Sequence, residues 1–448
     1  MNKIDIVILA AGKGERMVSR KPKVMHEIMG KPLLGYVVEM AQSLDPSRII
    51  VVTGYRRESV EAFLQDKKVV TAFQTEQKGT AHALASAKEH LGGNDVLVLL
   101  GDVPLIQSDT LREFLAFCRS AGSIVFLTTD VEDPSGYGRV LMDGDRITDI
   151  REHSDASDEE RRIKRINTGI CYIPFASFGL IDLIGADNAK GERYLTDICK
   201  VAGRHGKHAK GFFCPRPEEV LGINNLKGLL EANVVMRQRI NERHMNKGVT
   251  FLDTAIWIDD DVTIGADTVI APNCHITGTT VIGEMVSIGP SSIIRNCVIH
   301  DDVTIEGFVA MEGVEAKKGV AIGPFSRLRG GTVLETGVRI GNFVEVKNST
   351  LEDNSQVNHL SYIGDARIGK NVNIGAGTIT CNYDGVKKNK TVIEDGALVG
   401  ANTELVAPVK VGKGAVVGAG STITEDVPDG SLAVSRARQT NIEGYRRK

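Results

Sequence analysis

Residues 263–288 read T-I-G-A-D-T-V-I-A-P-N-C-H-I-T-G-T-T-V-I-G-E-M-V-S-I and place an isoleucine at every sixth position, from Ile264 to Ile288. This spacing is neither the period of an α-helix, about 3.6 residues, nor the alternation of a simple strand. It is typical of a prism-like parallel β-helix, in which each flat face takes about six residues and turns an aliphatic side chain inward. We therefore predict a β-helix of hexapeptide repeats around this stretch.

The hexapeptide period returns twice further along the chain. Residues 300–321 interrupt the period mildly, and residues 381–391 (C-N-Y-D-G-V-K-K-N-K-T) are too polar to continue a coil. We expect this second segment to leave the coil as a loop, and loops that project from rigid scaffolds often carry function. Later aliphatic positions of the period are Ile294, Ile322, Leu328, Leu334, Ile340, Val346, Val399, Leu405, Val411, Val417 and Ile423.

The first half of the chain shows a different pattern. Short apolar runs at residues 4–9, 49–53, 96–100 and 124–129 alternate with longer amphipathic stretches. This alternation is typical of β-α units around a mostly parallel sheet. Residues 226–248 carry apolar side chains at helical spacing and end at Gly248, a suitable helix stop. We expect an α/β, Rossmann-like domain over residues 1–225, a linker helix over 226–248, and a β-helix domain with a C-terminal tail over 249–448.

Composition excludes several classes of protein. The chain has 54 Lys and Arg against 57 Asp and Glu, a net charge of −3, so no strong overall field draws it to nucleic acid or to an anionic membrane. No apolar run reaches the ~18 residues of a membrane span, and no signal peptide begins the chain. The seven cysteines are scattered without a C-x-x-C pair, which predicts neither a disulfide framework nor a thiolate zinc site. We expect a cytoplasmic protein.

A phosphate-binding loop follows the first predicted strand. Residues 9–17 read L-A-A-G-K-G-E-R-M, where small residues let backbone N–H groups approach an anion and Arg16 adds charge. The loop has Met17 where a dinucleotide fingerprint needs its third glycine, and it lacks the G-K-[ST] ending of a P-loop. An ordinary glycine turn stays an equal alternative for this loop alone. Its companions are K-P-K-V with Lys23, Q-T-E-Q-K-G-T-A-H-A over residues 74–83, and L-L-G-D-V-P-L-I with Asp102.

With these companions the first half resembles nucleotidyltransferases that join a sugar 1-phosphate to a nucleoside triphosphate. In that reaction a phosphate oxygen attacks the α-phosphorus and pyrophosphate leaves, so two anions must be brought together. The resemblance implies that Lys23 and Arg16 neutralise the triphosphate, and that Asp102 and Asn225 hold Mg²⁺. It further implies a nucleotide along Leu9, Ala10, Ala11 and Gly12, a uracil edge at Gln74, Gly79 and Thr80, and a sugar against Gly138, Glu152, Asn167 and Asn225.

The β-helix half carries two motifs of its own. Residues 357–365 read V-N-H-L-S-Y-I-G-D, and residues 371–385 read N-V-N-I-G-A-G-T-I-T-C-N-Y-D-G. The repeats and these motifs resemble those of hexapeptide acyltransferases, which implies acetyl transfer. Acetyl transfer from a thioester to an amine needs a base that removes the amine proton and donors that stabilise an oxyanion. Imidazole is suited to such a base at neutral pH, so His359 is the candidate.

Together the two halves resemble the family of bifunctional N-acetylglucosamine-1-phosphate uridyltransferases and glucosamine-1-phosphate N-acetyltransferases. The resemblance implies a left-handed β-helix, transfer of acetyl from acetyl-CoA to glucosamine 1-phosphate, and then transfer of uridylyl from UTP to N-acetylglucosamine 1-phosphate. It also implies a homotrimer with acetyl-transfer sites between neighbouring chains. An alternative is a nucleotidyltransferase whose β-helix only assembles subunits.

The resemblance assigns roles in the acetyl-transfer site residue by residue. Glu345 would orient His359, and Asn382 would meet the reacting amine. The sugar phosphate would be held by Arg329, Lys347, Tyr362 and Asn373, and acetyl-CoA would lie along Ala376, Asn382, Tyr383, Ala401 and Ala419, with Arg436 near its phosphates.

Overall fold

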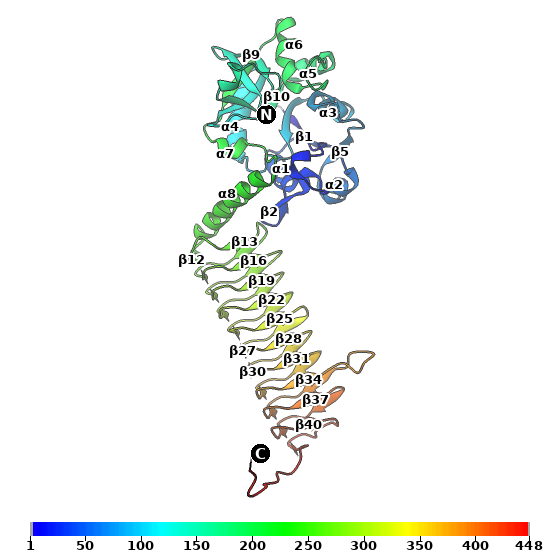
Figure 1. Cartoon of the computed structure of the whole chain (residues 1–448), viewed down its shortest axis with the longest axis vertical. Coiled ribbons are helices and arrows are strands. Elements are labelled where there is room, and N and C mark those ends of the chain that lie inside the picture. Colours follow the sequence, from blue (N-terminus) through cyan, green and yellow to red (C-terminus); the bar gives the residue numbers. More distant parts are fainter. Residues whose placement is uncertain (1–2, 447–448) are drawn as a thin grey trace. The chain divides into compact units, whose positions relative to one another are not determined.

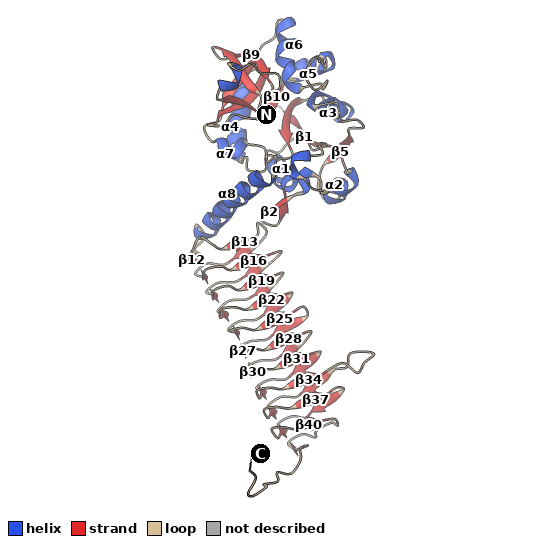
Figure 2. Ribbon diagram, viewed as in Figure 1, coloured by secondary structure: helices blue, strands red, loops and turns tan. Residues whose placement is uncertain are grey.

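The computed structural model describes residues 3–446 and divides the chain into two compact units, Met1–Met236 and Arg237–Lys448. The boundary falls inside a single long helix, α8 (Leu226–Met245), which covers most of the predicted linker. Helices and long strands make up the first unit, whereas short strands follow α8 in the second (Figure 2). Among residues 3–446, no helix is both long and apolar enough to cross a membrane.

The first unit is built on a mixed nine-stranded sheet. Each of the four predicted strands is present, as β1 (Ile4–Leu9), β4 (Arg48–Thr53), β6 (Asp95–Leu100) and β7 (Ile124–Asp130). The strands β5, β4, β1 and β6 run parallel, and β10 lies antiparallel between β6 and β7. The remaining strands of this sheet are β5 (Val70–Phe73), β8 (Arg139–Asp143), β9 (Arg146–Arg151), β10 (Arg165–Ile173) and β11 (Ala209–Phe213).

Helices cover both faces of this sheet and create two separate cores. Along β1, Ile6 and Ile8 belong to one core and Val7 to the other, as the alternation of a strand requires when both faces are buried. Helices α1 (Leu33–Ser43), α2 (Arg57–Leu64) and α4 (Ser108–Ala121) pack into the first core. Helices α3 (Thr80–Ser86) and α6 (Ile198–Arg204) pack into the second.

The register of the central strands sets the position of the first site. Leu9, the last residue of β1, pairs with Leu100, the last residue of β6, so the loops that follow them begin at the same edge of the sheet. Ligands of open α/β sheets bind at such carboxyl edges. The loop after β1 and Asp102 after β6 therefore lie side by side.

The second unit consists of three parallel sheets that share one coil of chain (Figure 1). The sheets begin at β12 (Thr250–Phe251), β13 (Trp257–Ile258) and β14 (Thr263–Ile264) and take successive strands in turn. Ile264 pairs with Ile282, Ile270 with Ile288 and Ile276 with Ile294, one pair in each sheet. All six side chains are buried, and each contributes about 1.5–3 kcal/mol of transfer free energy. The predicted parallel β-helix is confirmed.

Residues 300–321 continue the coil rather than interrupting it. Their inward side chains are Ile305 and Met311, followed by Ala316. In the third sheet Ile282 pairs with Ile299, and Ile299 with Ala316, so each coil is one residue shorter here than at Ile264. A shortened corner breaks the count of six while the stacking persists, which explains why the pattern fails in the sequence.

Residues 381–391 leave the coil as predicted. They connect β34 (Ile379–Cys381) to β35 (Thr391–Ile393), and an isolated bridge between Tyr383 and Lys388 closes them into a narrow loop (Figure 1). Across this insertion the coil resumes without a change of register, because Thr391 pairs with Ala366. The loop is thus an excursion from an unbroken solenoid.

Candidate functional site

A first cavity of about 500 Å³ opens at the carboxyl edge of the sheet in the first unit. The loop after β1, the start of α3 and the residues that follow β6 form its walls. It brings together the predicted nucleotide residues Leu9, Ala10, Ala11, Gly12, Lys23, Gln74, Gly79 and Thr80 with Asp102.

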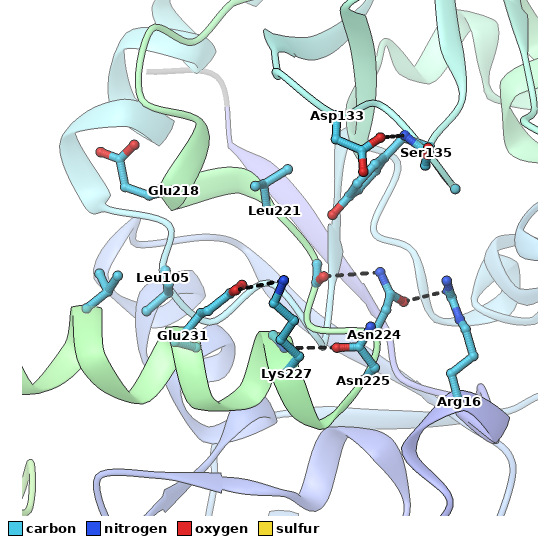
Figure 3. A pocket seen from close by; sticks show the side chains of 16 residues that line it. Arg16, Leu105, Asp133, Ser135, Glu218, Leu221, Asn224, Asn225, Lys227 and Glu231 are labelled. Atoms are coloured by element: carbon cyan, nitrogen blue, oxygen red, sulfur yellow. Dashed lines mark hydrogen bonds and ion pairs between the residues drawn. The ribbon is translucent and has the colours of Figure 1, made fainter. Parts of the chain in front are cut away.

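Opposite charges meet at the floor of this cavity. The Lys23 ammonium forms an ion pair with Asp102 and donates a hydrogen bond to Oδ1 of Asn224 (2.7 Å). Arg16 donates to the same oxygen (2.9 Å; Figure 3). Only 13% of the Lys23 side chain and 17% of the Asp102 side chain are exposed. Two cations, a carboxylate and an amide oxygen thus converge, a set of groups suited to a polyphosphate and a divalent cation.

The predicted metal ligand Asn225 lies at the start of α8, and its role as a ligand stays a prediction. Its Oδ1 accepts a hydrogen bond from the backbone N–H of Gly228 (2.9 Å) and so caps the first turn of α8. The neighbouring residue, Asn224, is the one that meets Lys23 and Arg16, and Figure 3 shows its contact with Arg16. The sequence contained a usable signal, because an Asn directly before a helical run is a typical N-cap.

A second cavity of about 210 Å³ adjoins the first and shares Leu9, Thr80, Leu100 and Asp102 with it. It contains the predicted sugar residues Gly138, Glu152 and Asn167, together with Arg16 and Asn224. The two cavities therefore meet at Asp102, as two substrates that react with each other require.

Glu152 is held in the second cavity by a residue that the sequence did not indicate. Its Oε1 accepts a hydrogen bond from the Thr196 hydroxyl (3.2 Å). Burial raises the pKa of the Glu152 carboxyl, and the Thr196 hydrogen bond opposes that rise. The backbone N–H of Asn167 donates to the Gly138 carbonyl (2.9 Å), so these sugar residues form one framework.

A third cavity, of about 400 Å³, shares Arg16 and Asn224 with the second. Residues 133–137 form one wall, and the first turns of α8 form the other, where Lys227 pairs with Glu231 (3.8 Å; Figure 3). The sequence gave no indication of this cavity. It extends the space around the cation cluster beyond the two cavities that hold the predicted residues.

In the second unit, His359 is oriented by the neighbouring coil. It ends β30 (Gln356–His359) and pairs in register with Asn342 of β27 (Arg339–Asn342). Its Nδ1 lies 2.9 Å from Oδ1 of Asn342. Because an amide oxygen only accepts hydrogen bonds, this contact places the imidazole proton on Nδ1 and leaves the lone pair of Nε2 free.

Glu345, which was predicted to orient His359, has a different partner in the chain. It lies on β28 (Glu345–Lys347), in another sheet of the prism, and pairs in register with Tyr362. Its Oε1 accepts a hydrogen bond from Arg329 (3.0 Å). Within the chain, strand register thus places Asn342 against His359 and Glu345 against Arg329, and the orienting role of Glu345 stays a prediction.

Cations gather beside this pair. The ammonium of Lys388, from the projecting loop, lowers the pKa of Lys347, and the Arg329 guanidinium adds to the effect. Lys388 was not predicted, because nothing in the loop sequence reveals that its side chain lies beside Lys347. Three clustered cations with one paired carboxylate form a site suited to a phosphate dianion.

Tyr362 and Asn382 lie close together near these cations. The Asn382 amide nitrogen is 3.5 Å from the Tyr362 hydroxyl and donates to Asp365 (2.5 Å). Asn373 stands one coil further along, in register with Gln356 of the His359 strand. The predicted sugar residues thus come from successive coils around His359.

The predicted coenzyme residues Ala376, Ala401 and Ala419 form a strip along one corner of the prism. Asn402 N–H donates to Ala376 (2.7 Å) and Gly420 N–H donates to Ala401 (2.8 Å), which places these corners on successive coils. Arg436 then donates to the carbonyl of Ala419 (2.6 Å). Tyr383 lies apart on the projecting loop and is 62% exposed. Small side chains along the strip leave room for an extended ligand.

Comparison with known families agrees with both halves. A MobA-like NTP transferase domain matches residues 6–167, and the six-repeat model of the bacterial transferase hexapeptide matches residues 390–425. These matches define the chain as a nucleotidyltransferase joined to a hexapeptide-repeat transferase, and they confirm the left-handed form of the β-helix.

Relatives match the chain over almost its full length. The bifunctional protein GlmU of Geobacillus sp. (strain WCH70) is 46% identical over 98% of this chain and 96% of its own. That of Thermodesulfovibrio yellowstonii is 45% identical over 99% of both. A crystal structure of UDP-glucose pyrophosphorylase complexed with UDP-glucose, 21% identical, covers 53% of this chain and all of its own with a TM-score of 0.44.

The chain belongs to the bifunctional GlmU family. It is an enzyme with uridyltransferase and acetyltransferase activities in the synthesis of UDP-N-acetylglucosamine, as its motifs predicted.

Proposed function

We propose that the first unit transfers the uridylyl group of UTP to N-acetylglucosamine 1-phosphate where its two cavities meet. The cluster of Lys23, Asp102 and Asn224 is the observation that supports this assignment. UTP lies along residues 9–12 with its uracil at Gln74, and the sugar lies against Glu152 and Asn167. The family relationship supports the choice of these substrates.

The chemistry follows from this arrangement. A phosphate oxygen of the sugar 1-phosphate attacks the α-phosphorus of UTP, the bond to the β-phosphate breaks, and pyrophosphate leaves. Lys23 and Arg16 reduce the repulsion between the two anions and stabilise the charge that develops on the departing pyrophosphate. Glu152, held by Thr196, fixes the sugar so that its phosphate faces the α-phosphorus.

The donor set of the first unit also fits Mg²⁺. Asp102 and Asn224 offer a carboxylate and an amide oxygen, and Mg²⁺ in nucleotide sites prefers one or two such ligands plus substrate phosphates and water. Among residues 3–446 no group of three or more His, Cys, Asp or Glu gathers as a dedicated cage. We assign Asp102 and Asn224 as the residues that would hold this ion, which would supply positive charge to neutralise the phosphates.

The different roles assigned to Asn224 and Asn225 can be tested by replacing each of them. Asn224→Ala is expected to lower uridylyl transfer at least tenfold and to raise the Mg²⁺ concentration needed for half-maximal rate, because a ligand is lost. Asn225→Ala removes only a helix cap and is expected to lower the unfolding free energy by about 1 kcal/mol with a rate within threefold of wild type. Pyrophosphate release against Mg²⁺ concentration measures both variants. A larger loss of rate in Asn225→Ala would return the assignment to Asn225.

We infer that the second unit acetylates glucosamine 1-phosphate with acetyl-CoA. The supporting observation is the imidazole of His359, whose free Nε2 is set by Asn342. As the amine nitrogen attacks the thioester carbonyl, Nε2 takes the amine proton, the carbon–sulfur bond breaks, and the coenzyme leaves as its thiol. Arg329, Lys347 and Lys388 hold the sugar phosphate, and Asn382 meets the amine. The coenzyme follows the strip from Ala376 to Arg436.

A homotrimer is the assembly we propose, and an exposed apolar ridge beside His359 supports it. Phe308, Phe325 and Phe343 occupy the same corner on successive coils, with ring centroids 4.9 and 5.6 Å apart. Leu360 extends the ridge by one coil and is the residue next to His359. All four side chains are about half exposed or more in the single chain, which is unusual for a contiguous apolar surface. A neighbouring chain that covers the ridge lies against the acetyl-transfer site.

Disrupting this ridge tests the assembly. Phe325→Asp is expected to reduce the mass measured by light scattering from three chains to one, because a charge is buried in an apolar contact. Aspartate tolerates the left-handed backbone at this position (φ 56°). Acetyl transfer should fall at least tenfold, whereas uridylyl transfer should stay within twofold. Leu252→Asp, an exposed apolar residue on the first coil, is the control. An unchanged mass for Phe325→Asp would exclude this ridge as the interface.

The proposed location is the cytoplasm, where UTP and acetyl-CoA are available. All seven cysteines, which lie in the described part of the chain, are free thiols, and six of them are buried. This agrees with a reducing compartment.

A further inference from the structure

The side-chain amide of Gln74 is fixed in one orientation. Gln74 lines the first cavity but is only 4% exposed. Its Nε2 lies 3.2 Å from the carbonyl oxygen of Gly79 and 3.0 Å from Nδ1 of His82. A carbonyl oxygen only accepts hydrogen bonds, so the amide atom that faces it must be the nitrogen. The opposite orientation would set two oxygens against each other.

The Gly79 carbonyl is itself held in place. It precedes α3 and also accepts a hydrogen bond from the backbone N–H of Ala83 (3.1 Å). The flanking chain is pinned to Arg193, whose N–H donates to Lys78 (2.8 Å) and whose carbonyl accepts from Ala81 (2.9 Å). Gly79 has φ +97°, and a Cβ there would lie 2.5 Å from the Arg193 carbonyl oxygen. The acceptor therefore cannot turn away from Gln74.

The orientation of Gln74 in turn defines the role of His82. Because Nε2 of Gln74 is a donor, Nδ1 of His82 must accept, and the imidazole proton is on its Nε2. Gly79 and His82 together use both hydrogens of the amide. In the described chain no donor meets Oε1 of Gln74, which leaves this oxygen as the hydrogen-bonding atom of the side chain available to a ligand in the cavity.

An acceptor at this position distinguishes the two pyrimidine bases. Uracil presents an N3–H donor on its pairing edge, whereas cytosine presents a bare N3 acceptor there. Oε1 of Gln74 attracts the first and repels the second, and sites that leave a buried polar group unpaired reject the wrong substrate strongly. We propose that His82 is a positioning residue that, through Gln74, makes the first unit select uracil nucleotides over cytosine nucleotides. This inference rests on the proposed placement of uracil against Gln74.

The test compares UTP with CTP as substrates of the full-length enzyme, with N-acetylglucosamine 1-phosphate and Mg²⁺. His82→Leu removes the acceptor, so Gln74 can turn its NH₂ group toward the base. The ratio of kcat/KM for UTP to that for CTP is expected to fall at least about fivefold, through slower use of UTP and unchanged or faster use of CTP. His82→Gln supplies another acceptor and should keep the ratio within twofold of wild type. Acetyl transfer by the same preparations reports correct folding.

Two outcomes separate the role of His82 from the proposed placement of uracil against Gln74. If His82→Leu slows UTP and CTP equally, His82 has only a structural role within α3, and the inference is overturned. Gln74→Ala supplies the second comparison, because it removes the oxygen itself and should lower the ratio further than His82→Leu. If Gln74→Ala leaves the ratio unchanged, uracil does not meet Gln74, and the proposed placement fails together with the inference.

Discussion

Replacing His359 by alanine is expected to lower acetyl transfer about 10²–10⁴-fold and to leave uridylyl transfer unchanged. The imidazole is the candidate base of the second unit, and its Nε2 is freed for proton transfer by the contact between Nδ1 and Asn342. Release of coenzyme A thiol from acetyl-CoA, followed in the presence of glucosamine 1-phosphate, measures the first activity. Pyrophosphate release in the same preparation measures the second.

Two further variants separate the orienting residues of His359. Asn342→Leu removes the acceptor of the Nδ1 proton and should lower acetyl transfer about tenfold or more. Glu345→Gln keeps an acceptor for Arg329, so a smaller loss is expected. A larger effect of Glu345→Gln would favour the assignment that the sequence suggested. Retention of more than about half the acetyl-transfer rate in His359→Ala would remove this histidine from the mechanism.

The Asp102→Asn change is expected to lower uridylyl transfer at least about 10²–10³-fold, with acetyl transfer nearly intact. It removes the carboxylate that pairs with Lys23 and that we assign to Mg²⁺, at the point where the two cavities meet. Asp109→Asn is a matched control, because Asp109 lies exposed in the first turn of the nearby helix α4. Loss of both activities together in a folded Asp102→Asn protein would contradict the assignment of one reaction to each unit.

Most of the fold could be predicted because it depends on repeated burial. Inward aliphatic positions such as Ile264 and Ile340 recur at a fixed spacing, and the alternating core of β1 follows from a strand covered on both faces. The coil over residues 300–321 escaped prediction because one corner is a residue shorter between Ile282 and Ile299. A search for aliphatic residues at strictly every sixth position misses such a shortening.

The site was less predictable where two residues compete for one role. Asn224 and Asn225 have the same side chain, and only the start of α8 decides which of them caps the helix. Asn342 and Glu345 are both near His359 in sequence, but strand register places them in different sheets. The positions of Lys388 beside Lys347 and of Thr196 beside Glu152 depend on the tertiary fold. No local sequence pattern reveals them.

Each of the two reactions is assigned to a separate site of one chain, and a mixture of the two variants tests this assignment most directly. Asp102→Asn and His359→Ala are each incubated with glucosamine 1-phosphate, acetyl-CoA, UTP and Mg²⁺, and products are identified by mass. Alone, Asp102→Asn should accumulate N-acetylglucosamine 1-phosphate, and His359→Ala should leave glucosamine 1-phosphate unchanged. Together they should form UDP-N-acetylglucosamine, because the intermediate made by one variant is used by the other. Failure of the mixture to form this product, although each variant alone retains its other activity, would contradict two independent sites.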